Sequence, residues 1–288
     1  MSKNAPFKNI AVIGAGTMGS GIAGQIANSE QEVLLLDIPG KTPNSITEDA
    51  VKKLIRSDPP ALMHKNKANL IKVGNIRDDF NKLANCDLII EAVVERLDIK
   101  KDLYNRINNI VNSKCVITSN TSTIPIKLLV EDMPQSFRER FAITHYFNPV
   151  RFMRLLELVR GEHTKSEIIK KLADYNDRIL GKGVVACNDT PGFLGNRVGV
   201  YALQVGMDEA YKLNLTVEEA DSLMGRPMGI PKTGIFGLYD LIGIDLMSDV
   251  VDTLGTILPD NDDFHKVGAS NIPTAELVKK MIDEGFTG

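Results

Sequence analysis

Short apolar runs alternate with longer amphipathic stretches through the first two thirds of the chain. This alternation predicts a parallel sheet whose strands are joined by helices. The runs predicted as strands are 10–13, 33–36, 88–94, 116–119, 141–144, 155–159 and 184–187. From about residue 193 the alternation stops, and helical periodicity covers 193–213, 217–225, 237–258 and 275–284. We therefore expect a doubly wound α/β domain over 1–187 and an all-α domain over 188–288, with residues 188–192 as the hinge.

The first predicted strand runs straight into a glycine-rich turn that opens a helix of small residues. The turn has the G-x-G-x-x-G spacing, in which the first glycine permits a tight turn, the second lets backbone approach a pyrophosphate, and the third lets helix and strand pack closely. The helix N-terminus that follows favours an anion. We interpret the turn as the dinucleotide site of a Rossmann-like domain, although a βα turn that binds nothing is the alternative. Its candidate contact residues are Gly14, Ala15, Gly16, Thr17, Met18 and Gly19.

The second predicted strand ends in Asp37, 18 residues after Gly19. A carboxylate at this place accepts hydrogen bonds from a ribose 2′-hydroxyl and repels a 2′-phosphate. The sequence therefore favours NAD over NADP as the cofactor.

A polar segment over about 41–77 is predicted to form a helical arm. Ser45-Ile-Thr-Glu48 has the form of a capping box, a helix is expected to about Arg56, Asp58-Pro-Pro60 breaks it, and a second helix is expected over 61–71. The segment 41–77 holds eight Lys or Arg residues and three acids. Such an excess of positive charge favours a polyphosphate ligand, while a solvated helical face is the alternative for each lysine.

Polar residues follow the apolar runs at the ends of several predicted strands. Glu95, Ser122 and His145 are examples, and ligands of open α/β sheets bind outside the carboxyl ends of the strands. Of the four histidines only His145 falls at this edge, and imidazole suits proton transfer near neutral pH. Glu157 lies in an apolar run, which is unusual for an unpaired carboxylate, and is the candidate acid that orients His145. A buried pair that serves packing alone is the alternative.

Composition narrows the class of protein. The chain has 288 residues, 43% of them hydrophobic, without a signal-peptide pattern or an apolar run long enough to span a bilayer, so we expect a soluble, cytoplasmic protein. Cys86, Cys115 and Cys187 show no metal-ligand spacing, which predicts reduced thiols and no metal site. The net charge of −3 argues against general binding of nucleic acid.

Four separate motifs resemble those of the L-3-hydroxyacyl-CoA dehydrogenases of fatty-acid β-oxidation. They stand in that family's order and cover almost the whole chain, which is more specific than the glycine turn alone. The motifs are 14–23, Ser119-Asn-Thr-Ser122, His145-Tyr-Phe-Asn-Pro149 with Glu157, and Asp189-Thr-Pro-Gly-Phe193 with Asn196-Arg197.

The resemblance implies NAD-dependent oxidation of a (3S)-3-hydroxyacyl-CoA to the 3-oxoacyl-CoA. In the family the histidine is the general base and acid and the glutamate is its partner, which here implies His145 and Glu157. Ser122 and Asn196 would hold the reacting oxygen of the substrate. The resemblance further implies that Glu95, Lys100, Ser122 and Asn148 approach the cofactor and that the charged arm helps to hold coenzyme A.

Some segments depart from the compact members of this family. The insertion 230–237 and the stretch 58–63 are more similar to the bacterial multifunctional β-oxidation proteins. The chain stops at 284–288, where the family continues into a basic, glycine-rich run, so we expect a fragment of a longer protein or a shortened form. The helical domain would then form a homodimer or pack on a partner domain of the same chain. The alternatives in function are another NAD(P)-dependent β-hydroxyacid dehydrogenase and a weakened, cofactor-binding fragment.

Overall fold

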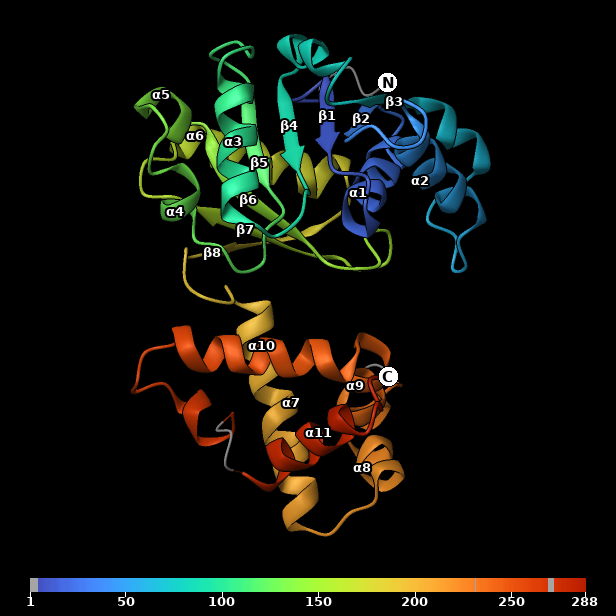
Figure 1. The fold of residues 1–288 in the computed structure, drawn as a ribbon, viewed down its shortest axis with the longest axis vertical. Coiled ribbons are helices and arrows are strands. Elements are labelled where there is room, and N and C mark those ends of the chain that lie inside the picture. Colours follow the sequence, from blue (N-terminus) through green and yellow to red (C-terminus); the bar gives the residue numbers. More distant parts are fainter. Residues whose placement is uncertain (1–4, 231, 269–271) are drawn as a thin grey trace. The chain divides into compact units, whose positions relative to one another are not determined.

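The computed structural model describes residues 5–230, 232–268 and 272–288 and divides after Phe193 into two compact units. Figure 1 shows the sheet and its helices in the N-terminal unit, and helices alone in the C-terminal unit from Leu194 onward. Each unit is described by itself. The α/β domain followed by an all-α domain that the sequence predicts is confirmed.

One eight-stranded sheet organises the described part of the N-terminal unit, in the order β3-β2-β1-β4-β5-β6-β7-β8. The neighbouring strands are parallel except β6 and β7, which are antiparallel. The strands are β1 Ile10–Ile13, β2 Val33–Asp37, β3 Ile71–Asn75, β4 Leu88–Glu91, β5 Val116–Ser119, β6 Phe141–Tyr146, β7 Leu155–Arg160 and β8 Gly183–Cys187.

Helices cover both faces of this sheet (Figure 1). They are α1 Thr17–Asn28, α2 Ser45–Arg56, α3 Leu97–Asn108, α4 Ile126–Val130, α5 Gln135–Arg138 and α6 Ser166–Asp174, with 3₁₀ turns at Lys65–Leu70 and Phe80–Asn85 and a π-helix at Tyr175–Ile179. Because side chains of a strand alternate between faces, Ile10 and Val12 join the core with α1 and α2, whereas Ala11 and Ile13 join the core with α3 and α4. The two cores make the domain doubly wound.

Two glycines let β1 and α1 approach as the sequence motif requires. Gly14 has a φ of +102°, and a Cβ there would lie 2.3 Å from the carbonyl oxygen of Ala92. A Cβ on Gly19 would lie 1.8 Å from the carbonyl oxygen of Gly14. A side chain at either position would therefore push the turn away from the sheet.

The arm over 41–77 differs from its prediction in three ways. The helix α2 covers Ser45–Arg56 as expected, but its N-cap is Asn44 and no side-chain cap is formed, so the predicted capping box is wrong. The predicted second helix is reduced to the 3₁₀ turn Lys65–Leu70. Residues Ile71–Asn75 instead form β3, an edge strand that pairs with β2. The three-residue alternation of Ile71 and Val73 around an exposed Lys72 is too short to separate a strand from a helix by periodicity.

Two predicted strand ends near the site also move, and the last two strands run in the opposite direction. The strand β4 ends at Glu91 and not at residue 94, so Glu95 lies four residues beyond it. The strand β6 continues to Tyr146, so His145 lies inside the strand and not after it. The strand β7 runs antiparallel to β6 and parallel to β8, so the carboxyl ends of β7 and β8 lie at the edge of the sheet opposite to those of β1 to β6.

The C-terminal unit is helical in its described residues, with a core that includes Met207, Tyr239, Met247 and Phe264. Its helices are α7 Gly195–Lys212, α8 Val217–Leu223, α9 Phe236–Ile242, α10 Ile244–Ile257 and α11 Pro273–Asp283, with 3₁₀ turns at Arg226–Met228 and Asp263–Lys266. The single helix predicted over 237–258 is broken at Gly243, whose φ is +111°. Pro231, which lies in the insertion predicted over 230–237, is outside the described residues.

Candidate active site

The imidazole of His145 and the carboxylate of Glu157 face each other in the N-terminal unit. The two residues are register partners across β6 and β7, and Nδ1 of His145 lies 2.6 Å from Oε2 of Glu157. Glu157 is fully buried and His145 almost so. A buried carboxylate at this distance fixes the imidazole tautomer with the proton on Nδ1, because a carboxylate only accepts hydrogen bonds. Nε2 is then the nitrogen that can take up a proton.

Apolar and sulfur groups surround this pair. The ring of Phe147 lies 4.5 Å from the imidazole centroid to centroid, and the ring of Phe193 lies 5.9 Å away. The thiol of Cys187 donates to Oε1 of Glu157 at 3.8 Å. These neighbours keep the pair in a largely dry environment, in which charge-assisted hydrogen bonds are stronger than in water.

The segment from Ser119 to Thr123 carries Ser122 just beyond β5. The side chain of Glu95 holds this segment, because its Oε1 accepts hydrogen bonds from the hydroxyls of Thr121 and Thr123, the latter at 3.0 Å. Burial raises the pKa of the Glu95 carboxyl, but the charge of Lys100 and the threonine hydroxyls outweigh burial, so its pKa lies below the ordinary value. Glu95 is therefore ionised at neutral pH beside the segment that carries Ser122.

Lys100, a predicted cofactor residue, has its ammonium group buried between two carboxylates. Nζ lies 2.7 Å from Oε1 of Glu91 and 3.2 Å from Oε2 of Glu95. Glu91 is absent from the residues singled out in the sequence. The same sequence feature, an acidic residue inside an apolar strand, distinguishes both Glu157 and Glu91.

The glycine turn fits a dinucleotide phosphate at one further point. A Cβ added to Gly16 would meet nothing within 4 Å, so a ligand can approach the backbone closely there. At Gly14 and Gly19 the space that a Cβ would need is occupied by neighbouring backbone atoms. Asp37 closes the turn: Oδ2 accepts from the amide of Ala15 at 2.5 Å and Oδ1 from the amide of Ile38 at 2.6 Å. The residues of the turn are thus compatible with NAD.

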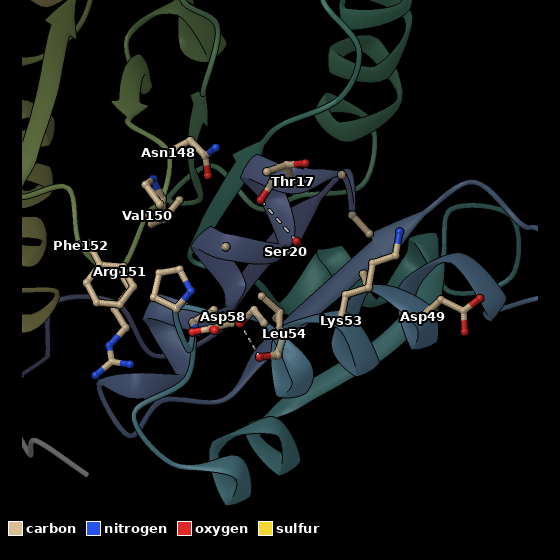
Figure 2. A pocket seen from close by; sticks show the side chains of 18 of the residues that line it. Thr17, Ser20, Asp49, Lys53, Leu54, Asp58, Asn148, Val150, Arg151 and Phe152 are labelled. Carbon is tan, nitrogen blue, oxygen red and sulfur yellow. Dashed lines mark hydrogen bonds between the residues drawn. The ribbon is translucent and has the colours of Figure 1, made fainter. Parts of the chain in front are cut away.

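A cleft of about 700 Å³ lies beside the glycine turn. Figure 2 shows Asp49 and Lys53 on α2 at one side of it and the segment Asn148–Phe152 at the other, with Thr17 and Ser20 of α1 between them. Arg151 ties the second side to the arm, since its guanidinium donates to the carbonyl of Pro60 at 2.5 Å. The charged side chains that line the cleft are two cations, Lys53 and Arg151, and three carboxylates, Asp37, Asp49 and Asp58.

The positive charge predicted for the arm is partly neutralised. Lys52, Lys67, Lys72 and Arg77 form ion pairs with nearby carboxylates. Lys53 enters no ion pair among the described residues, and it is the arm lysine that lines the cleft. The arm therefore offers one lysine to a ligand in the cleft instead of a continuous basic face.

The buried side chain of Lys182 binds main-chain carbonyls of the segment Asn148–Phe152 and of Met153, which follows it. Nζ of Lys182 donates to the carbonyl oxygens of Val150 and Met153, the latter at 3.0 Å. Burial lowers the pKa of Lys182 to about 8.

Asn196 lies in the first turn of α7 and so belongs to the C-terminal unit. Its neighbour Arg197 forms an ion pair with Asp262 inside that unit. An approach of Asn196 to the substrate stays a prediction.

Two absences hold for the described ranges 5–230, 232–268 and 272–288. They contain no group of three or more His, Cys, Asp or Glu side chains placed to hold a metal ion. None of their helices is both long and apolar enough to cross a membrane.

Comparison with known proteins finds matches over both units. Residues 9–190 match the NAD binding domain of 3-hydroxyacyl-CoA dehydrogenase, and residues 192–288 match the C-terminal domain. A Deinococcus radiodurans protein assigned as a 3-hydroxyacyl-CoA dehydrogenase is 39% identical over 98% of this chain and 80% of that protein. The structure of (S)-3-hydroxybutyryl-CoA dehydrogenase from Ralstonia eutropha superposes with a TM-score of 0.80 at 28% identity, over 98% of this chain and 95% of that chain.

Some relatives are much longer. A Rickettsia prowazekii protein assigned as a fatty acid oxidation complex trifunctional enzyme is 42% identical over 98% of this chain, and the chain spans 39% of its length. Matches to both domain models and to relatives of similar length, such as the Deinococcus protein, decide the family. The chain belongs to the 3-hydroxyacyl-CoA dehydrogenase family, whose N-terminal domain binds NAD.

Proposed function

We propose that this chain oxidises (3S)-3-hydroxyacyl-CoA thioesters to 3-oxoacyl-CoA with NAD, and catalyses the reverse reduction. The observation that carries the proposal is the 2.6 Å contact between His145 Nδ1 and Glu157 Oε2. It supplies a base with a fixed tautomer in a domain of a family that binds NAD. Relatives that are named hydroxyacyl-CoA dehydrogenases support the same class of reaction.

In the proposed mechanism His145 acts as the general base and acid. Nε2 takes the proton of the 3-hydroxyl group in oxidation and returns it to the carbonyl oxygen in reduction. Glu157 holds Nδ1–H and stabilises the imidazolium that forms. NAD, when bound, supplies the acceptor for the hydride that leaves C3.

Ser122 and Asn196 are proposed to hold the reacting oxygen of the substrate. Glu95, Lys100, Ser122 and Asn148 are proposed to position the cofactor, together with Asp37 and the residues of the glycine turn. Lys53 in the cleft beside the turn is proposed to contact a phosphate of coenzyme A. The bacterial relatives favour a cytoplasmic location and, in a longer protein, a partner domain in the same chain.

A spectrophotometric assay tests the proposal. Acetoacetyl-CoA and NADH are added to the protein, and the loss of NADH absorbance is followed. We expect turnover that depends on both substrates and a product with the 3S configuration. Turnover of free 3-hydroxybutyrate without turnover of the thioester would instead favour a different β-hydroxyacid dehydrogenase. Binding of NADH without any turnover would favour a cofactor-binding fragment.

A further inference from the structure

The carboxylate of Glu91 is fully buried at the carboxyl end of β4 and accepts four hydrogen bonds. Oε1 accepts from Nζ of Lys100 at 2.7 Å and from the amide of Val93 at 2.8 Å. Oε2 accepts from the hydroxyl of Tyr104 at 2.5 Å and from that of Ser119 at 2.7 Å. We call Glu91, Lys100, Tyr104 and Ser119 the Glu91 cluster. Burial of Tyr104 and, after it, the negative charge of Glu91 raise the pKa of this phenol well above the ordinary value, so Tyr104 stays a donor.

Stability alone gives little reason for such a cluster in a sheet. Replacing a buried ion pair by apolar side chains of similar volume is often neutral or stabilising, because desolvation of the two charges offsets their attraction. A fully paired buried network instead fixes one geometry, since each donor and acceptor has a single good arrangement. The elements that this network fixes are therefore informative.

The Glu91 cluster controls the segment that carries Ser122. The backbone amide of Asn120 donates to the carbonyl of Glu91 at 2.7 Å, and Ser119 Oγ accepts from the amide of Thr121 at 3.2 Å. Lys100 connects Glu91 to Glu95, which accepts from the hydroxyls on both sides of Ser122. The bond from Asn120 uses the main chain of Glu91, whereas the contacts through Ser119 Oγ and through Lys100 depend on the position of the Glu91 carboxylate.

The same segment is tied to the strand of His145. Oδ1 of Asn120 accepts from the amide of Tyr146 at 2.9 Å, and Tyr146 follows His145 in β6. Asn120 therefore links the segment that carries Ser122 to the strand that carries His145, and its amide is bonded to the main-chain carbonyl of Glu91.

We propose that Glu91 is a positioning residue that holds the segment Ser119–Thr123 so that Ser122 and His145 address the same substrate oxygen. The catalytic part of this inference rests on the proposed function. Glu91 itself is fully buried behind Lys100 and Ser119 and acts through them.

Tyr104→Phe is the sharpest test variant, because it removes one donor from Glu91 and keeps the ring that packs on Phe137 and Phe141. Its matched control is Tyr175→Phe, which removes another fully buried hydroxyl, one that donates to Gln31 at 2.9 Å and has no contact with the Glu91 cluster. Glu91→Gln is the second, stronger variant, because it removes the nearer of the two charges that Lys100 faces. All variants are made in the full chain.

Two measurements separate positioning from general stability. Hydrogen exchange of the protein without ligand reports the amides of Asn120 and Thr121, and steady-state kinetics with acetoacetyl-CoA and NADH report kcat and KM. In Tyr104→Phe we expect these amides to exchange roughly 3- to 10-fold faster, because the Glu91 carboxylate loses one of its four donors and keeps the other three. We expect kcat to fall by a similar factor of about 3 to 10, with the KM for acetoacetyl-CoA within about twofold of the wild type, because binding of the nucleotide part does not use the segment.

The outcomes are distinct. Amide exchange and kcat that stay within the change produced by Tyr175→Phe would overturn the proposal. If Glu91→Gln does not fold, Tyr104→Phe still decides the matter. If the wild-type chain shows no turnover, the proposed function fails, while amide exchange at residues 120–121 and a titration of NADH fluorescence still show whether Glu91 positions the segment: faster exchange with weaker NADH binding supports it, and no change in either overturns it.

Discussion

His145 and Glu157 stand opposite each other across the antiparallel strands β6 and β7, with Nδ1 and Oε2 2.6 Å apart. The contact joins two strands of the sheet, and it needs no loop to hold either side chain. A pair built on strands is more precise than one built on loops, which suits a base that must meet one substrate oxygen.

Replacement of His145 tests the proposed base directly. His145→Gln should lower kcat by about 10²- to 10⁴-fold, because a positioned proton-transfer group contributes that much. NADH affinity, measured by fluorescence titration, should stay near the wild-type value. A variant that keeps full turnover would remove His145 from the mechanism.

Replacement of Glu157 tests the orienting acid. Glu157→Gln keeps the shape but can present an amide N–H to Nδ1, which favours the wrong tautomer, so kcat should fall between about 10- and 10⁴-fold. An unchanged kcat would show that the pair serves packing only.

Asp37 is expected to select NAD over NADP. Asp37→Ser removes the charge and the acceptor, so the KM for NAD should rise by roughly 10- to 100-fold, the value of a hydrogen bond to a charged group. Use of NADP should rise at the same time. Asp37→Asn, which keeps the acceptor that Ala15 uses but not the charge, should give an intermediate result. Exclusive use of NAD by both variants would place the selectivity elsewhere.

Lys53 is expected to contact coenzyme A. Lys53→Ala should raise the KM for acetoacetyl-CoA by about 3- to 30-fold, as expected for a charge-assisted contact with phosphate, and leave kcat nearly unchanged. The KM for acetoacetyl-pantetheine, which lacks the nucleotide, should not change. Lys52→Ala is the control, because Lys52 is bound to Asp49 and does not line the cleft. Equal effects of the two variants on both substrates would contradict the assignment.

The buried Lys182 is expected to make the stability of the folded protein depend on pH. Its pKa of about 8 in the folded protein lies below the ordinary 10.5, because burial disfavours the charged form. Below pH 8 both folded and unfolded chains carry the proton, and between 8 and 10.5 the unfolded chain holds more of it, so this group makes the folded state more stable as pH rises through that window.

Denaturant unfolding of the wild type and Lys182→Met measures this effect. The variant should be less stable by about 1–3 kcal/mol, since two buried carbonyls lose a donor. The difference between the two proteins should increase from pH 8 to pH 10. Lys170→Met, at an exposed position of α6, should show no such trend. A constant difference across the window would contradict the assigned pKa.

Much of the fold follows from continuous apolar runs. The strand predicted over 116–119 is β5 to the residue, and all of its residues are buried, including the polar Thr118 and Ser119. The strand β3 was not predicted, since an edge strand keeps Lys72 in solvent and contains Gly74. The break at Gly243 was also missed, because a glycine with positive φ looks in the sequence like any glycine inside a helix.

The candidate site was predictable where a residue contradicts its surroundings. Glu157 and Glu91 are both acids in apolar strands, and in the structure each faces a nitrogen base or cation. The sequence shows that such acids are unusual, but it does not show which residues pair with them. Lys100 contacts Glu91 because the packing of α3 on β4 brings the two side chains together. The proposed roles of Ser122 and Asn196 depend on where their side chains lie relative to a bound substrate, and neither strand patterns nor charge can predict that position.

The antiparallel register of β6 and β7 fixes which residues pair but leaves the length of the intervening loop free. Side chains alternate along both strands, so a slip of one residue would turn Glu157 to the opposite face and present Leu156 or Leu158 to His145. Insertions and deletions between residues 147 and 154 can therefore reshape the cleft wall without touching the acid–base pair, provided that the ladder keeps its pairing. Diversity in substrate among relatives is accordingly expected to collect in that loop, and strict invariance in the two strands that frame it.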